Sequence, residues 1–258
     1  MDVGISTACL YPMETEKALE TLGKLGVRTV EIFFNAPSEL QPEFLAKLKA
    51  IAQQYALKII AIHPYSSGFE PFMFFTNYER RFQDAMVMYE DYYRAANDLG
   101  AKIVVLHGDR KEGQLPDEVY YDRFGEMFLH AKQNGVILAQ ENVERCRSRS
   151  SSFIRRMYEY LGDNVRFVLD LKQAVRSGED IFTMCNAMDK GIVHLHLSDN
   201  CAQGDCLPPG SGTFDFAALK QHLKSHGYMG SGVIELYRNN YKTTANLYES
   251  YCFMKAIP

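Results

Sequence analysis

Nine polar or ionisable side chains stand toward the ends of short apolar runs, where they could supply acid–base groups and metal ligands. They are Glu31, His63, His107, Glu141, Asp170, His194, His196, Asp199 and Glu235. Glu141 is typical, because an apolar Ile-Leu-Ala run shortly precedes it in the segment 137–143. A carboxylate at the end of a buried run must be solvated, paired or bound to a cation, since an isolated buried charge is costly. We therefore expect these side chains to be one another's partners.

The apolar runs that carry these residues are predicted to be the strands of a (β/α)8 TIM barrel. Eight of them recur at roughly even spacing, at 3–7, 29–34, 59–64, 103–108, 137–143, 167–172, 192–199 and 232–237. Segments with helical periodicity lie between them, including 15–26, 42–57, 89–100 and 216–227. Eight alternations of strand and helix, with no Gly-x-Gly-x-x-Gly loop after the first strand, favour a closed barrel over an open doubly wound sheet. No linker divides the chain, so residues 1–258 are predicted to form one domain.

A cation is expected where the strand ends meet. The carboxyl ends of barrel strands converge on one face, and carboxylates crowded there would repel one another unless a cation lay between them. A Glu, an Asp, a His and a Glu from four successive strands give a mixed oxygen and nitrogen ligand set. Such a set suits Mn²⁺, Mg²⁺, Co²⁺ or Zn²⁺ better than an ion that prefers thiolates. We therefore predict one divalent metal ion and leave its identity open.

The chain resembles the xylose-isomerase-like barrel superfamily of sugar-phosphate isomerases and epimerases over essentially its whole length. The resemblance rests on the segments VEIFF, IHP, LHGD, QENV, VLDLKQA, HLHLSDN, LPPGSGTFDF and VIELY, which occur in family order. Similarity to the ketose 3-epimerases of that superfamily implies that the metal is bound by Glu141, Asp170, His196 and Glu235. It also implies that Glu141 and Glu235 move protons on opposite faces of the substrate.

This set of residues suits proton abstraction next to a carbonyl. A sugar carbonyl and its neighbouring hydroxyl can chelate one metal, which acts as a Lewis acid and stabilises the enediolate formed on proton loss. A carboxylate on each face can then remove and return protons, and each such group typically contributes roughly 10²–10⁴-fold. We predict a metal-dependent isomerase or epimerase of a small sugar, sugar phosphate or hydroxy-ketone, with Glu141 and Glu235 as acid and base.

Further residues near the expected mouth of the barrel are candidates for substrate binding. They are Glu31, His63, His107, Lys172, Gln173 and Arg147. Lys172 either binds a substrate carboxylate or phosphate, or pairs with Asp199 or Glu235. Arg147 belongs to an arginine-rich segment, 144–152, that either receives such an anion, which guanidinium groups bind bidentately, or is a solvated helix start.

Two positions depart from the family pattern and keep other functions open. Gln173 and Cys206 stand where family members often carry histidine. The first alternative is a zinc-dependent apurinic endonuclease, in which residues like His63 and His107 hold extra zinc ions. That trinuclear site, however, resembles a pattern with histidine at the two departing positions. A third reading is a sugar-binding barrel without catalytic activity.

Composition narrows the setting and the partners. A net charge of −4 argues against a nucleic-acid partner, and no segment is long and apolar enough to suggest a membrane span. Six scattered cysteines without Cys-x-x-Cys spacing are expected to be reduced thiols, as in a cytoplasmic protein. The segment 66–78 holds four phenylalanines and is expected to cover the substrate or to pack against a neighbouring loop or a second subunit, which is consistent with a homo-oligomer.

Overall fold

Eight parallel strands close into a barrel in the computed structural model, which describes residues 1–258. The strands are β1 (Asp2–Ser6), β2 (Thr29–Phe34), β3 (Lys58–Pro64), β4 (Ile103–Leu106), β5 (Ile137–Glu141), β6 (Phe167–Asp170), β7 (Ile192–Leu197) and β10 (Ser231–Ile234). Their order around the barrel is β1, β10, β7, β6, β5, β4, β3 and β2. A separate antiparallel pair consists of β8 (Asp199–Cys201) and β9 (Gly204–Leu207). The prediction of a (β/α)8 barrel is confirmed.

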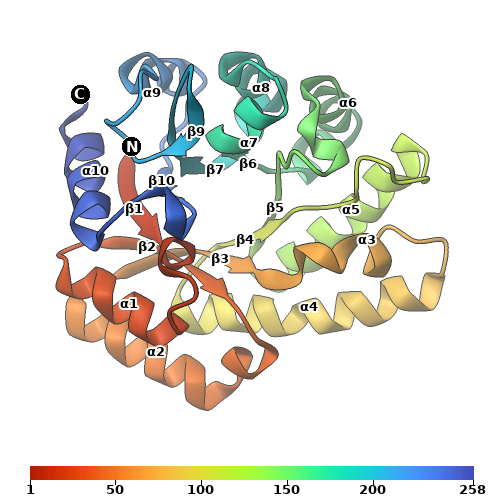
Figure 1. Ribbon diagram of the computed structural model, residues 1–258. Helices are drawn as coiled ribbons and strands as arrows, with labels where there is room; N and C mark the ends of the chain where they lie inside the picture. The colour runs from red at the N-terminus through yellow and green to blue at the C-terminus, as the bar shows by residue number, and fades with distance from the viewer.

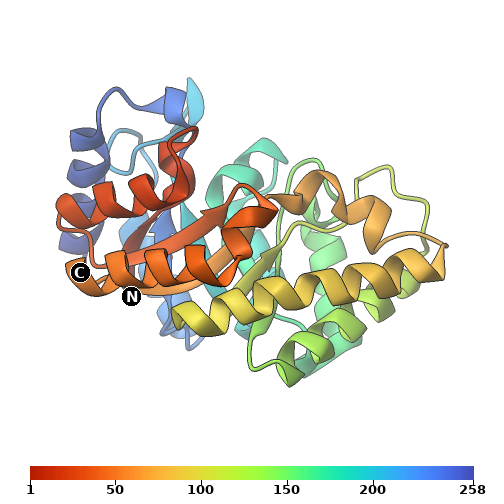
Figure 2. The same cartoon turned by 90° about the horizontal axis from the view of Figure 1, so that it is seen from below.

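Helices follow the strands and cover the outside of the barrel (Figure 1). They are α1 (Thr15–Lys24), α2 (Pro42–Tyr55), α3 (Glu70–Met73), α4 (Glu79–Leu99), α5 (Asp117–Gln133), α6 (Ser151–Leu161), α7 (Leu171–Arg176), α8 (Ile181–Met188), α9 (Phe216–Ser225) and α10 (Thr244–Ala256). Short 3₁₀ turns occupy Thr7–Leu10, Pro37–Leu40, Tyr65–Gly68, Arg147–Arg149, Gly162–Asn164, Asp189–Gly191 and Arg238–Asn240. The long α4 extends past the barrel beside α3 (Figure 2). None of the helices has the length and hydropathy required to cross a membrane.

Side-chain alternation along the strands places the polar residues above an apolar floor. Residues two apart in a strand point to the same side of the sheet. The polar residues and their apolar predecessors are Ala61 and His63, Val105 and His107, Ala139 and Glu141, Val168 and Asp170, and Val233 and Glu235. The five apolar members, together with Ile60, make up two small buried clusters. The sequence pattern therefore positions the polar residues in one layer at the carboxyl ends of the strands.

The strand predicted at 167–172 is shorter than expected. It ends at Asp170, because Oδ1 of this carboxylate accepts the backbone N–H of Gln173 at 2.9 Å and caps α7. Lys172 therefore lies in the first turn of a helix and not in a strand. The helix expected at 89–100 is longer than predicted, since it begins ten residues earlier.

The strand predicted at 192–199 is interrupted after Leu197, and Asp199 begins the β8–β9 hairpin. The Asp199 carboxylate accepts the backbone N–H groups of Asn200, Gly210, Gly212 and Phe214 at 2.8–3.0 Å. Because four donors of its own loop fill this carboxylate, it organises the turn and is not a partner of Lys172.

Candidate active site

Four residues from neighbouring strands form what we call the acidic cluster: Glu141, Asp170, His196 and Glu235. Nδ1 of His196 lies 3.3 Å from Oε1 of Glu141, and 3.6 Å from Oδ2 of Asp170 and from Oε2 of Glu235. One ligand atom from each of the four lies within 4.8 Å of all the others. All four side chains are buried. The structure thus brings together the four residues that the family resemblance implies as ligands.

The acidic cluster has the properties of a site for a divalent ion. Oε2 of Glu141 and Oδ2 of Asp170 are buried and accept no hydrogen bond, although Nε2 of His107 and Nζ of Lys172 lie 3.2 and 3.1 Å from them as ion-pair partners. A buried acceptor without a partner is costly, and three neighbouring carboxylates repel one another. Three carboxylates and an imidazole match the ligands of Mn²⁺, Co²⁺, Zn²⁺ or Mg²⁺. The residues present therefore fit a divalent metal ion.

Glu31 orients His196 from behind the acidic cluster. Oε2 of Glu31 lies 3.1 Å from Nε2 of His196 and 3.0 Å from Nε2 of His194, while Oε1 accepts the hydroxyl of Ser6. A hydrogen bond from Nε2–H of His196 leaves Nδ1 as the ligand atom that faces the acidic cluster. The sequence-based expectation was a substrate contact, but Glu31 is fully buried in this supporting position.

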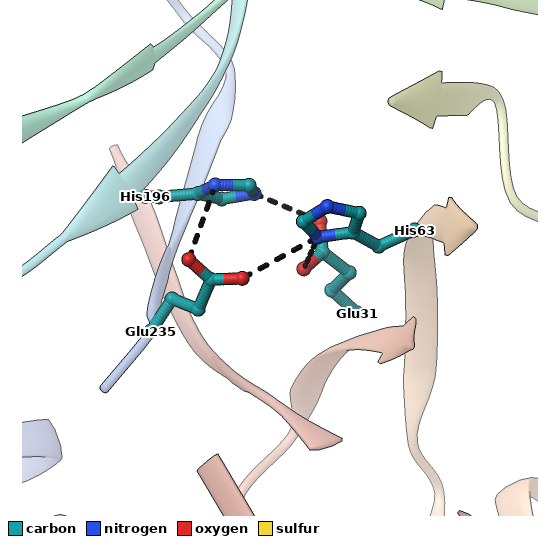
Figure 3. Close-up of side chains that lie close together, drawn as sticks. All are labelled: Glu31, His63, His196 and Glu235. Carbon is teal, nitrogen blue, oxygen red and sulfur yellow. Dashed lines mark hydrogen bonds and ion pairs between the residues drawn. The ribbon is translucent and has the colours of Figure 1, made fainter. Parts of the chain in front are cut away.

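His63 lies opposite His196 and joins the same network (Figure 3). Its Nδ1 is 3.5 Å from Oε1 of Glu31 and 3.4 Å from Oε1 of Glu235. The imidazoles of His63 and His196 stack with their centroids 5.3 Å apart. Each histidine therefore contacts both Glu31 and Glu235, so the two glutamates and two histidines fix one another's positions.

His63 also contacts His107, and we call these two residues the histidine pair. Their Nε2 atoms are 3.0 Å apart, and Nε2 of His107 is 3.2 Å from Oε2 of Glu141. Behind His107, Oε2 of Glu70 accepts the backbone N–H groups of His107 and Gly108 at 2.9 and 2.7 Å. Glu70 was missed in the sequence, because it lies in an aromatic-rich segment and its backbone partners are 37 and 38 residues away.

Charges in the site stabilise the ionised carboxylates and imidazoles. Burial raises the pKa of Glu141, but the imidazoles of His107, His196 and His63 outweigh this effect and lower the pKa to about 2. Burial likewise opposes ionisation of Glu235, and Lys172 and His196 more than compensate, so its pKa falls well below its usual range. Both glutamates are therefore ionised at neutral pH.

A cavity of about 440 Å³ opens above the acidic cluster. Glu141 and Glu235 line it, whereas Asp170 and His196 do not. The predicted substrate contacts that line the cavity are His63, His107, Lys172 and Gln173. Tyr237 also lines it, two residues beyond Glu235, a spacing that could have identified it in advance.

Arg147 lies outside this cavity, contrary to the expectation of a substrate contact. Its guanidinium binds the carboxylate of Asp117 and lies over the rings of Tyr120 and Phe153. Arg145, from the same arginine-rich segment, lines the cavity instead and donates to Oγ of Ser67 at 2.8 Å. The choice between the two arginines depends on Asp117, which is 30 residues away in sequence.

A parallel barrel with carboxylates and histidines at the ends of its strands, below an open cavity, has its candidate site at the face where TIM barrels carry their active sites. The model of the xylose isomerase-like TIM barrel family matches residues 19–257, so the chain belongs to this family. An uncharacterised protein of Mycobacterium leprae is 27% identical, over 91% of this chain and 88% of the relative.

Solved structures share the fold at lower identity. D-psicose 3-epimerase from Clostridium cellulolyticum, solved with D-tagatose, superposes with a TM-score of 0.79 at 16% identity, covering 100% of this chain and 99% of that one. The IolI protein with a bound zinc atom superposes with a TM-score of 0.77 at 22% identity, covering 99% of this chain and 95% of that one. At these identities, the likeness establishes the common architecture.

Proposed function

We propose that the protein is a divalent-metal-dependent isomerase or epimerase of a small sugar or hydroxy-ketone. The observation that carries this proposal is that two of the four residues of the acidic cluster line the cavity. Glu141 and Glu235 line it and can reach a substrate, whereas Asp170 and His196 do not line it and are placed to hold an ion. Membership of the xylose isomerase-like family and the shared fold with a psicose epimerase and a zinc-bound protein support the same reading.

Each residue of the acidic cluster has a distinct part in this chemistry. A divalent ion bound there would supply a Lewis acid for the substrate carbonyl. Glu141 extends from β5 and Glu235 from the end of β10, and β6 and β7 separate these strands in the barrel. The two carboxylates therefore approach the cavity from different sides. One removes the proton next to the carbonyl, and a proton returned by the other inverts the configuration at that carbon.

The histidine pair supplies the polar wall beside these carboxylates. His63 and His107 line the cavity, and their ring N–H groups can donate to substrate hydroxyl oxygens. Arg145 is exposed at the same cavity and offers a site for an anionic group on the substrate. These contacts favour a polyhydroxylated ketone, with or without a carboxylate or phosphate.

The proposal is tested by proton exchange rather than by product identity. Metal-loaded protein is incubated in D₂O with a panel of ketoses, ketose phosphates and hydroxy-keto acids, and NMR records deuterium entering the carbon next to the carbonyl. We expect incorporation into at least one compound, and a loss of at least about 100-fold in Glu235→Gln and in Glu141→Gln, in line with the contribution of one acid–base group.

Glu144→Gln is the matched control, because Glu144 is close in sequence, pairs with Lys111 and does not line the cavity. Its exchange rate is expected to equal that of the wild-type protein. Near-normal exchange in Glu235→Gln, or no exchange with any compound of the panel, would contradict the proposed function.

A zinc-dependent phosphodiesterase is the second candidate, and one observation favours it. His63, His107 and Glu141 also offer ligand atoms within 4.8 Å of one another, so they are a further group able to hold an ion. The amide oxygen of Gln173 accepts the backbone N–H of Glu144 at 3.0 Å, so this side chain is engaged by the protein where the nuclease pattern has histidine. The number of ions bound per chain distinguishes the two functions.

A further inference from the structure

Lys172 places a cation directly against the acidic cluster. Its side chain is 4% exposed, and Nζ lies 2.7 Å from Oε2 of Glu235 and 3.1 Å from Oδ2 of Asp170. These are the same two oxygens that lie 3.6 Å from Nδ1 of His196, the predicted ligand nitrogen. The ammonium therefore occupies one side of the two carboxylate oxygens that the cluster offers to a metal ion.

The ammonium satisfies the acidic cluster only in part. It donates a hydrogen bond to Glu235, but Oδ2 of Asp170 and Oε2 of Glu141 keep no hydrogen-bond partner. The ammonium thus leaves one oxygen of Asp170 and one of Glu141 open to a stronger cation. A divalent ion among the same oxygens would lie within a few ångströms of the ammonium, and like charges at that separation repel strongly in a buried site.

We propose that Lys172 and the divalent ion compete for Asp170 and Glu235, so that this lysine sets the metal affinity and turns into the cavity when the ion binds. The inference rests on the proposed function, because it concerns the same ion. A route for the movement is present: Lys172 lines the cavity, and its Nζ lies 5.0 Å from the centre of the Tyr237 ring. Lysine has a flexible four-carbon stem, so the ammonium can change partners without movement of α7.

Released from the carboxylates, the ammonium would face the space that the substrate fills. There it can bind a substrate oxygen or an anionic group, together with Arg145 at the same cavity. Metal binding and substrate binding are then coupled through one side chain. Without the ion, Lys172 neutralises part of the charge of the acidic cluster and thereby stabilises the protein.

The test measures Mn²⁺ affinity by isothermal titration calorimetry for the wild-type protein, Lys172→Met and Lys172→Gln. Both variants remove the ammonium and keep a long side chain, so we expect Mn²⁺ to bind at least about tenfold more tightly as the repulsion is lost. Arg145→Gln is the control, since it removes a cavity cation that does not contact the acidic cluster, and its Mn²⁺ affinity should be unchanged. Equal or weaker binding in both Lys172 variants would overturn the proposal.

Thermal unfolding provides a second readout that does not depend on catalysis. In EDTA, Lys172→Met is expected to unfold at a lower temperature than the wild-type protein, and the difference should narrow or reverse in saturating Mn²⁺. A destabilisation of equal size with and without Mn²⁺ would contradict the competition. Tighter Mn²⁺ binding by the Lys172 variants, without proton exchange by the wild-type protein, would leave this inference standing while the proposed function fails. Proton exchange by the wild-type protein, without tighter Mn²⁺ binding by the variants, would leave the proposed function standing while this inference fails.

Discussion

Glu70, which lies behind the histidine pair, is a buried carboxylate like those of the acidic cluster. The two regions differ in how far the carboxylate oxygens are satisfied by hydrogen bonds. Glu70, behind His107, is filled by donors, since it accepts two backbone N–H groups and the hydroxyl groups of Tyr89 and Ser66. In the acidic cluster, Glu141 and Asp170 each retain a buried oxygen that accepts no hydrogen bond. Burial of a carboxylate therefore does not by itself identify a functional group in this barrel. The carboxylates of Glu141 and Asp170 differ from that of Glu70 in their unfilled oxygens.

Removing a ligand from the acidic cluster should have the largest effect. Asp170→Asn keeps the size of the side chain and removes its charge, so we expect Mn²⁺ or Zn²⁺ affinity to fall by more than the ~10–100-fold typical of a supporting residue. Elemental mass spectrometry of purified protein should find about one ion per chain in the wild-type protein and almost none in this variant.

His107→Gln is the matched change in the histidine pair, and it should retain the single ion. Loss of the ion from both variants would remove the distinction between the two regions. Two or three zinc ions in the wild-type protein, one of them lost with His107, would show that the histidine pair also binds metal and would favour the phosphodiesterase.

Glu31 tests the boundary between the two regions, because it contacts the acidic cluster through His196 and the histidine pair through His63. Glu31→Gln weakens the acceptor that fixes the ring of His196, so we expect about 10–100-fold weaker metal binding. Ser6→Ala removes only the hydroxyl that donates to Glu31 and should cost about 1 kcal/mol of stability with little change in metal affinity. Wild-type metal binding in Glu31→Gln would show that His196 needs no such support.

Glu70→Gln should have the smallest effect on metal affinity, but it should clearly lower the free energy of unfolding. The variant should lose about 1–3 kcal/mol at pH 7, because two backbone N–H groups lose a charged acceptor. Burial raises the pKa of Glu70, but His107, Gly108 and Tyr89 outweigh it and lower the pKa below its ordinary value of 4.5. A lowered pKa means that the stabilisation is fully present above pH 4.5 and is lost as the pH falls through the folded-state value.

Denaturant unfolding of metal-free protein checks this prediction. The difference in unfolding free energy between the wild-type protein and Glu70→Gln should be constant from pH 7 down to about 5 and should shrink in more acidic buffer. A difference that grows toward acid would mean that the carboxyl of Glu70 is protonated in the folded protein.

The fold and the positions of the residues in the acidic cluster could be predicted from the sequence, because both follow from local patterns. Alternation along a strand places Glu141 above Ala139 and Asp170 above Val168, and parallel strands in a barrel bring such pairs to one face. Similarly, the positions of His196 and Glu235 follow once β7 and β10 are known.

Other features depended on contacts between distant segments. Arg147 pairs with Asp117 and so lies outside the cavity, and Glu70 accepts backbone N–H groups from the residues that follow β4. Neither contact is predicted by a local sequence pattern. Lys172 was placed in a strand, because the capping of α7 by Asp170 was not foreseen. Its contact with Glu235 was one of two alternatives, which only the tertiary structure could separate.

The cap at the start of α7 gives Asp170 a further property. One oxygen of this carboxylate is fixed by the N–H of Gln173, while the other faces the acidic cluster without a hydrogen bond. Rotation of the carboxylate would remove this cap, so the second oxygen is already oriented when the chain has folded. Most of the rotational entropy of this side chain is therefore lost during folding and not when an ion arrives. The beginning of α7 thus fixes the orientation of a proposed metal ligand.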